Sequence, residues 1–107
     1  MIVVTTEHIP GQQETASLGL VRGSSIRARH AGKDLMVFFR NLVGGEVHEY
    51  SKLLGESREQ AIDRMIEEAE ALGADAVIAV RFQTSMVMQG AAEMLCYGTA
   101  VKLEATF

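Results

Sequence analysis

The sequence predicts an α+β fold in which an antiparallel sheet of about four strands packs against one short and one long helix. The most informative segment is 61–80, where an amphipathic helical pattern ends at Gly73 and passes directly into the apolar run 76–80. A glycine just past the last helical residue is typical of a helix C-terminus, because glycine adopts the left-handed conformation without steric cost. The apolar run is typical of a strand that is buried on both faces.

Two strands and a loop are expected at the start of the chain. Residues 2–5 are β-branched and are followed by Pro10-Gly11, a dipeptide that marks a turn. A second strand is expected over 15–21, and Gly23-Ser24-Ser25 should end it. The polar and basic segment 25–33 then predicts a surface loop.

Two helices should follow. Residues 35–43 predict a short helix, which Asp34 is placed to cap. Apolar residues then recur at steps of three and four over 47–72, the pattern of a long amphipathic helix. Gly55 and Ser57 interrupt this stripe, so the helix either continues through them or breaks and restarts at a Ser57 cap. We expect one continuous helix, because an interior glycine costs only about 1 kcal/mol.

The last two strands are expected over 76–88 and 92–105, joined as a hairpin near Gln89-Gly90. The final strand is apolar on both faces until Lys102, whereas a sheet with one face in water alternates apolar and polar residues. The short helix is also apolar around most of its circumference. Because large exposed apolar patches rarely persist on monomers, this surplus predicts a homo-oligomer.

Composition narrows the class of protein. The 107 residues allow one domain, 1–107, and 48% hydrophobic with 22% charged residues is ordinary for a soluble globular chain. A net charge of -4 argues against binding to nucleic acid or to an anionic membrane. The single Cys96 cannot form an internal disulfide, which suits a reducing compartment. With no recognisable signal peptide or membrane span, we expect a cytoplasmic protein.

A distinctive set of residues is distributed over 34–102. Its members are Gly44-Gly45, Tyr50, Leu54, Arg58, Ala61, Ala69, the run Leu72-Gly73-Ala74-Asp75-Ala76-Val77 and the run Gly98-Thr99-Ala100-Val101. Together they resemble the YbjQ family of small bacterial proteins, which carries a heavy-metal-binding label. The resemblance implies a small α+β subunit that assembles as a ring, with a pentamer as the expected form. The family usually has arginine and glutamate where this chain has Glu46 and Ser51, so a shared site that used them is altered here.

The sequence contains only weak candidates for metal ligands, namely His8, His48 and Cys96. Tight binding of soft metals normally needs paired thiolates, and this chain has one cysteine. Cys96 lies in a predicted strand, where a buried, inert thiol is the favoured interpretation. The histidines, including His30, have no partner at a helical spacing, although a ring could bring identical residues together. Methionines near the hairpin could attract Cu(I), but they are more typical of core or interface filler: Met86, Met88 and Met94.

Ligand-binding candidates are Arg29, His30, Tyr50 and Arg58. Arg29 and His30 belong to a basic loop that could hold a small anion beside the start of the short helix, although a solvated loop is favoured. Tyr50 and Arg58 lie near one face of the long helix, where packing and an ion pair are the simpler interpretation.

No catalytic constellation is recognisable, so the sequence favours a non-enzymatic, ring-forming, cytoplasmic protein that binds a small ligand or metal at subunit boundaries. No cofactor is expected apart from such a metal. The alternative is a purely structural or protein-interaction module without a ligand, and an enzyme ranks third. The expected partner is the chain itself, with no nucleic acid and no membrane.

Overall fold

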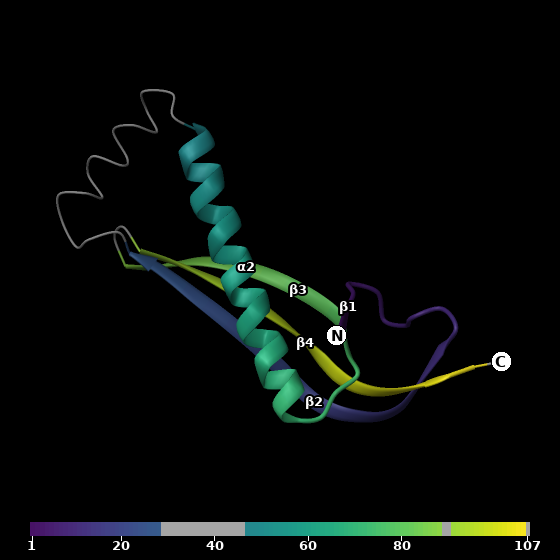
Figure 1. The fold of residues 1–107 in the computed structure, drawn as a ribbon. Helices are drawn as coiled ribbons and strands as arrows, with labels where there is room; N and C mark the ends of the chain where they lie inside the picture. Colours follow the sequence, from purple (N-terminus) through teal and green to yellow (C-terminus); the bar gives the residue numbers. More distant parts are fainter. Residues whose placement is uncertain (29–46, 89–90, 107) are drawn as a thin grey trace.

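A computed structural model describes residues 1–28, 47–88 and 91–106, and their side chains over 1–26, 54–85 and 92–106. It shows an α+β fold in which one long helix crosses a four-stranded sheet (Figure 1). The expected short helix over 35–43 lies outside the described residues. The elements are β1 (Ile2–Val3), β2 (Gln12–Ala28), α2 (Val47–Ala71), β3 (Ala76–Met88) and β4 (Ala91–Ala105).

The sheet has the order β1-β3-β4-β2 and is mixed, which corrects the antiparallel sheet expected from the sequence. β4 pairs antiparallel with both β2 and β3, but β1 pairs parallel with β3. The physical reason is the connection: β2 and α2 both intervene between β1 and β3, which gives the chain enough length for a parallel crossover. Backbone bonds from Val4 N to Val77 O and from Val80 N to Val4 O, both 3.0 Å, continue this contact.

β2 is longer than the sequence indicated. It continues through Gly23-Ser24-Ser25 to Ala28, so the expected strand end and the first part of the expected loop are wrong. Gly23 serves a different purpose, because a Cβ built there would overlap the carbonyl oxygen of Ala61 and the amide nitrogen of Met65. Glycine inside a strand often marks such a close approach of another backbone.

α2 is one continuous helix that passes through Gly55, as expected. Its C-terminus has the predicted glycine cap, since Gly73 has a φ of 76°. The amide of Gly73 donates to the carbonyl of Glu70 at 2.9 Å, and the amide of Ala74 donates to that of Ala69 at 3.1 Å. These two bonds form a Schellman motif, which satisfies carbonyls that the helix itself leaves free. In the part of the chain that the structure describes, no helix is long and apolar enough to cross a membrane.

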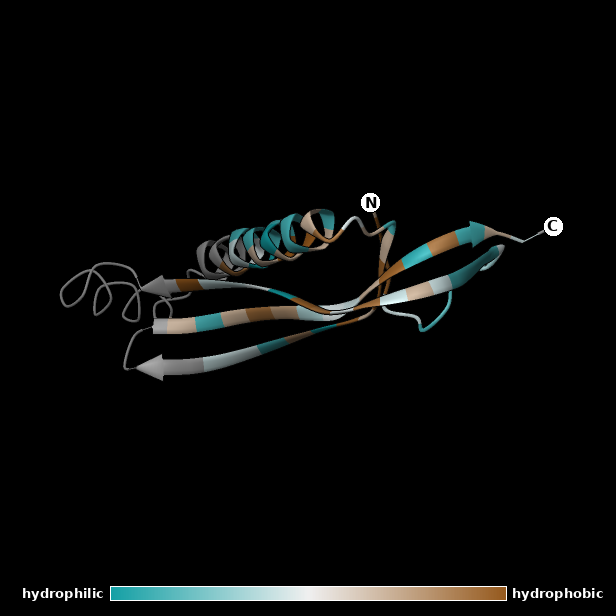
Figure 2. Ribbon diagram, turned by 90° about the horizontal axis from the view of Figure 1, so that it is seen from below, coloured by the Kyte–Doolittle hydropathy of each residue, from teal (hydrophilic) through white to brown (hydrophobic). Residues whose placement is uncertain are grey.

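The core lies between α2 and one face of the sheet, and no described element covers the opposite face (Figure 2). The chain is correspondingly elongated, with extents of 56 × 23 × 16 Å and a radius of gyration of 17.2 Å. A compact chain of this length would have a radius of gyration of about 13 Å. The buried core residues are Val21, Ala61, Met65, Ala69, Val77, Val80, Met94, Cys96 and Ala100.

Candidate functional site

The site residues expected from the sequence do not form one cluster. His8 lies in the exposed segment between β1 and β2, where its Nδ1 is 3.1 Å from Glu14 Oε1. Arg58 is exposed on α2, whereas Cys96 is fully buried on β4. Among the residues that the structure describes, no group of three or more His, Cys, Asp or Glu side chains could hold a metal ion. Arg29 and His30 lie outside those residues, and for His48 and Tyr50 only the backbone in α2 is described.

The soft donors that do meet are Cys96 and Met65. Cys96 Sγ donates to Met65 Sδ at 3.4 Å, and both side chains are completely buried between β4 and α2. Burial raises the pKa of the Cys96 thiol, because desolvation disfavours the thiolate that a heavy metal would need. One protonated thiol beside a thioether does not fit a tight heavy-metal site. The contact between Cys96 and Met65 instead packs α2 against β4. The sequence pointed to Met86, Met88 and Met94 and missed Met65, which the helical apolar stripe assigned only to the core.

Three neutral polar groups form a second buried cluster at the same interface. Ser57 Oγ donates to Ser25 Oγ at 3.1 Å, and Ser25 Oγ donates to Gln60 Oε1 at 2.8 Å. Both serines are buried, so these hydrogen bonds satisfy groups that would otherwise be costly to desolvate. A cluster of hydroxyls and an amide contains no general base to activate a serine as a nucleophile. Its hydrogen bonds join β2 to α2 and thereby fix the position of the helix on the sheet. The sequence gives little sign of it, since Ser25 and Ser57 are separated by 32 residues.

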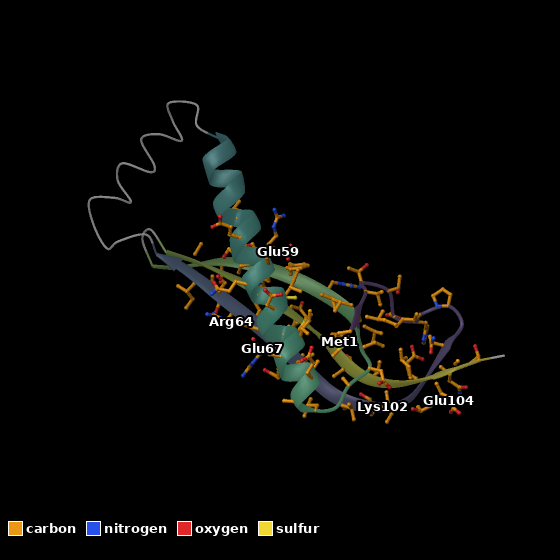
Figure 3. All side chains as sticks on the ribbon, viewed as in Figure 1. Met1, Glu59, Arg64, Glu67, Lys102 and Glu104 are labelled. Carbon is orange, nitrogen blue, oxygen red and sulfur yellow. The ribbon has the colours of Figure 1, made fainter. Side chains whose placement is uncertain are left out.

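A groove of about 560 Å³ lies at the sheet edge formed by β2 and is lined by residues of β2, α2 and β4. Arg64 reaches from α2 toward this edge (Figure 3), and its Nη1 donates to the carbonyl oxygen of Ser24 at 2.5 Å. Arginine and glutamate side chains both line the groove, and these groups can bind a small polar molecule or an extended chain. The lining residues are Arg22, Gly23, Ser24, Arg64, Glu68, Glu93 and Leu95.

The sheet face opposite α2 is termed the open face and is defined by Leu20, Arg22, Ile26, Leu95 and Tyr97. Alternation along β2 places its three members on the face opposite the buried Val21, Gly23 and Ser25. Leu95 and Tyr97 lie on the same face, because they flank the buried Cys96 on β4. Leu20 is 63% exposed and Ile26 is 58% exposed, so large apolar side chains of β2 face solvent here. The sequence predicted an apolar surplus on the last strand and on the short helix, whereas these exposed side chains belong to β2.

Comparison with known proteins gives a consistent result. Residues 1–104 match the YbjQ family, which is described as "Putative heavy-metal-binding". A UPF0145 protein of Methanosarcina acetivorans is 61% identical over 96% of this chain and 97% of its own length. One from Fervidobacterium nodosum is 57% identical over 96% of this chain and 95% of its own length. A solved structure of a Pediococcus pentosaceus protein of unknown function, from the DUF74 family, has a TM-score of 0.68 at 16% identity. It covers 97% of this chain and 98% of that one, which shows a shared fold.

Proposed function

Because the chain belongs to the YbjQ family of UPF0145 proteins, we propose that it is a non-enzymatic homo-oligomer that binds a small ligand or a metal at its subunit boundaries. The proposed assembly is a ring, with five subunits as the expected number. Its proposed place is the cytoplasm, and its proposed partner is a second copy of itself.

The observation that carries the proposal is that the helix covers only one face of the sheet. Burial of Leu20 and Ile26, which are 63% and 58% exposed, would contribute roughly 1–2 kcal/mol each to association. The far end of the sheet supports the same conclusion, because β4 from Lys102 onward pairs only with β2. A two-stranded ribbon is marginally stable in water by itself, and contact with another copy would support it.

Subunit boundaries are also the most suitable place for a ligand. The two soft donors that meet among the described residues, Cys96 and Met65, lie inside the core. The groove beside Arg64, by contrast, lies at the surface and offers guanidinium and carboxylate groups. A metal at a boundary would need donors from two copies, for which the exposed His8 is the described candidate.

Native mass spectrometry and light scattering of the purified protein test the proposal together. We expect a single oligomer well above the subunit mass of 11.6 kDa, with any bound molecule visible as added mass. A stable monomer at micromolar concentration would refute the assembly. An oligomer without added mass, and without a response to titrated metal ions, would favour the alternative of a structural module that binds no ligand.

A further inference from the structure

We propose that copies of this chain join edge to edge, with the outer edge of β2 in one subunit paired to the outer edge of β3 in the next. This inference rests on the proposed oligomer and adds the surfaces by which its subunits meet. The partner is a second copy in the same orientation, so that one sheet continues from subunit to subunit.

Both edges lie open along the described residues. β2 ends the sheet on one side, and its only strand neighbour is β4. On the other side β1 pairs with β3 only at Ala76 and Val77, and Val80 is the last β3 residue whose amide bonds to the N-terminal segment. The stretch of β3 from Arg81 onward therefore forms a second free edge. Long free edges are uncommon, because they offer rows of unpaired backbone groups to any other strand.

The backbone groups that point outward can be identified. The carbonyl of Ser24 bonds to Arg64, so it points away from β4. Because strand residues alternate in direction, Gly23 points toward β4, where it lies opposite Cys96. Cys96 consequently directs its backbone groups to β2, and Phe82, its partner on β3, directs its own groups outward. The two edges thus direct backbone donors and acceptors outward at Ser24 and Phe82, and Arg64 would have to release the carbonyl of Ser24 for a neighbouring strand to bond there.

The direction and length of these edges match. β2 and β3 both run antiparallel to β4, so they run parallel to each other and a neighbouring β3 can extend the sheet beyond β2. The stretch 20–28 lies beyond the two register shifts of β2, and 81–88 is of similar length. Joining opposite edges of one sheet is a heterologous contact, which produces a ring when the rotation between subunits closes.

Phe82 explains why the contact would be favourable. It lies on the same side of the sheet as Cys96, yet 44% of it is exposed. α2 does not shield it, because the helix packs over β2 at Gly23. When the sheet continues, α2 of one subunit lies over β3 of the next, and Phe82 of that β3 comes to lie near Arg64 of α2. The guanidinium of Arg64 can then stack on the aromatic ring.

Cysteine cross-linking tests this geometry. We would combine Ser24→Cys with Gln83→Cys, Ser24→Cys with Ser85→Cys, and Ile26→Cys with Gln83→Cys, which covers neighbouring registers on one side of the sheet. At least one double variant should form a ladder of covalent multimers under mild oxidation, and each single variant should stay uncross-linked. Covalent dimers from a single β2 variant would show β2 paired with β2 and overturn the inference. The wild type, whose Cys96 is buried, is the control.

A pair of charge substitutions decides the matter independently of register. Phe82→Glu should raise the dissociation constant of the oligomer by about tenfold or more, with the far-UV circular dichroism unchanged. Glu67→Lys, a charge change at an exposed position on α2, should leave the oligomer intact. If Leu20→Glu on the open face dissociates the oligomer and Phe82→Glu does not, the open face alone holds the subunits together and edge pairing is wrong. A monomeric wild type would instead refute the proposed function itself.

Discussion

Gly23→Ala should be among the most destabilising single-methyl additions in this chain. The added Cβ would meet the carbonyl oxygen of Ala61 and the amide nitrogen of Met65, and would lie 3.0 Å from the carbonyl carbon of Arg64. All three are backbone atoms of α2, so no side-chain rotation relieves the overlap and the helix must move away from β2. Overpacking of a core typically costs about 1–3 kcal/mol, and the rigid neighbours here place the expected loss at about 3 kcal/mol.

That loss is large beside the total stability of a small domain, which is about 5–15 kcal/mol. Urea denaturation followed by far-UV circular dichroism should show a lower midpoint at an unchanged slope. Gly55→Ala is the matched control, because its Cβ would meet only Arg58 Nη2 at 4.0 Å inside a helix. That variant should gain up to about 1 kcal/mol from helix propensity. A loss below about 1 kcal/mol for Gly23→Ala would refute the close approach of α2.

Three further results are expected. Gly73→Ala should cost roughly 1 kcal/mol, because no atom lies within 4 Å of the added Cβ and only the positive φ opposes it; an unchanged melting temperature would contradict the cap. Ala79→Gly should be neutral or stabilising by up to about 1 kcal/mol, since Ala79 has a φ of 53°, and a clear loss by urea denaturation would contradict that strain. Calorimetry with Zn²⁺ and Cu(I) should show no tight thiolate binding; submicromolar affinity that vanishes in Cys96→Ser would overturn this expectation.

Local pattern was sufficient for α2, its cap at Gly73 and the β3–β4 pair. Each of these depends on residues close together in the chain: a stripe of three- and four-residue steps, one glycine that adopts positive φ, and two β-rich runs separated by a short turn. Local pattern did not indicate the role of Gly23. The sequence predicts a strand end there, whereas Gly23 lies inside β2 at the close approach of α2.

Tertiary structure decided the features that depend on distant partners. β1 can lie parallel to β3 because 72 residues separate the end of β1 at Val3 from the start of β3 at Ala76, and no local signal reports which edge a returning chain will join. The contact of Cys96 with Met65 and the cluster of Ser25, Ser57 and Gln60 arise only when α2 settles on β2 and β4. Glycine at position 23 permits that approach, since the missing side chain is what lets the two backbones meet.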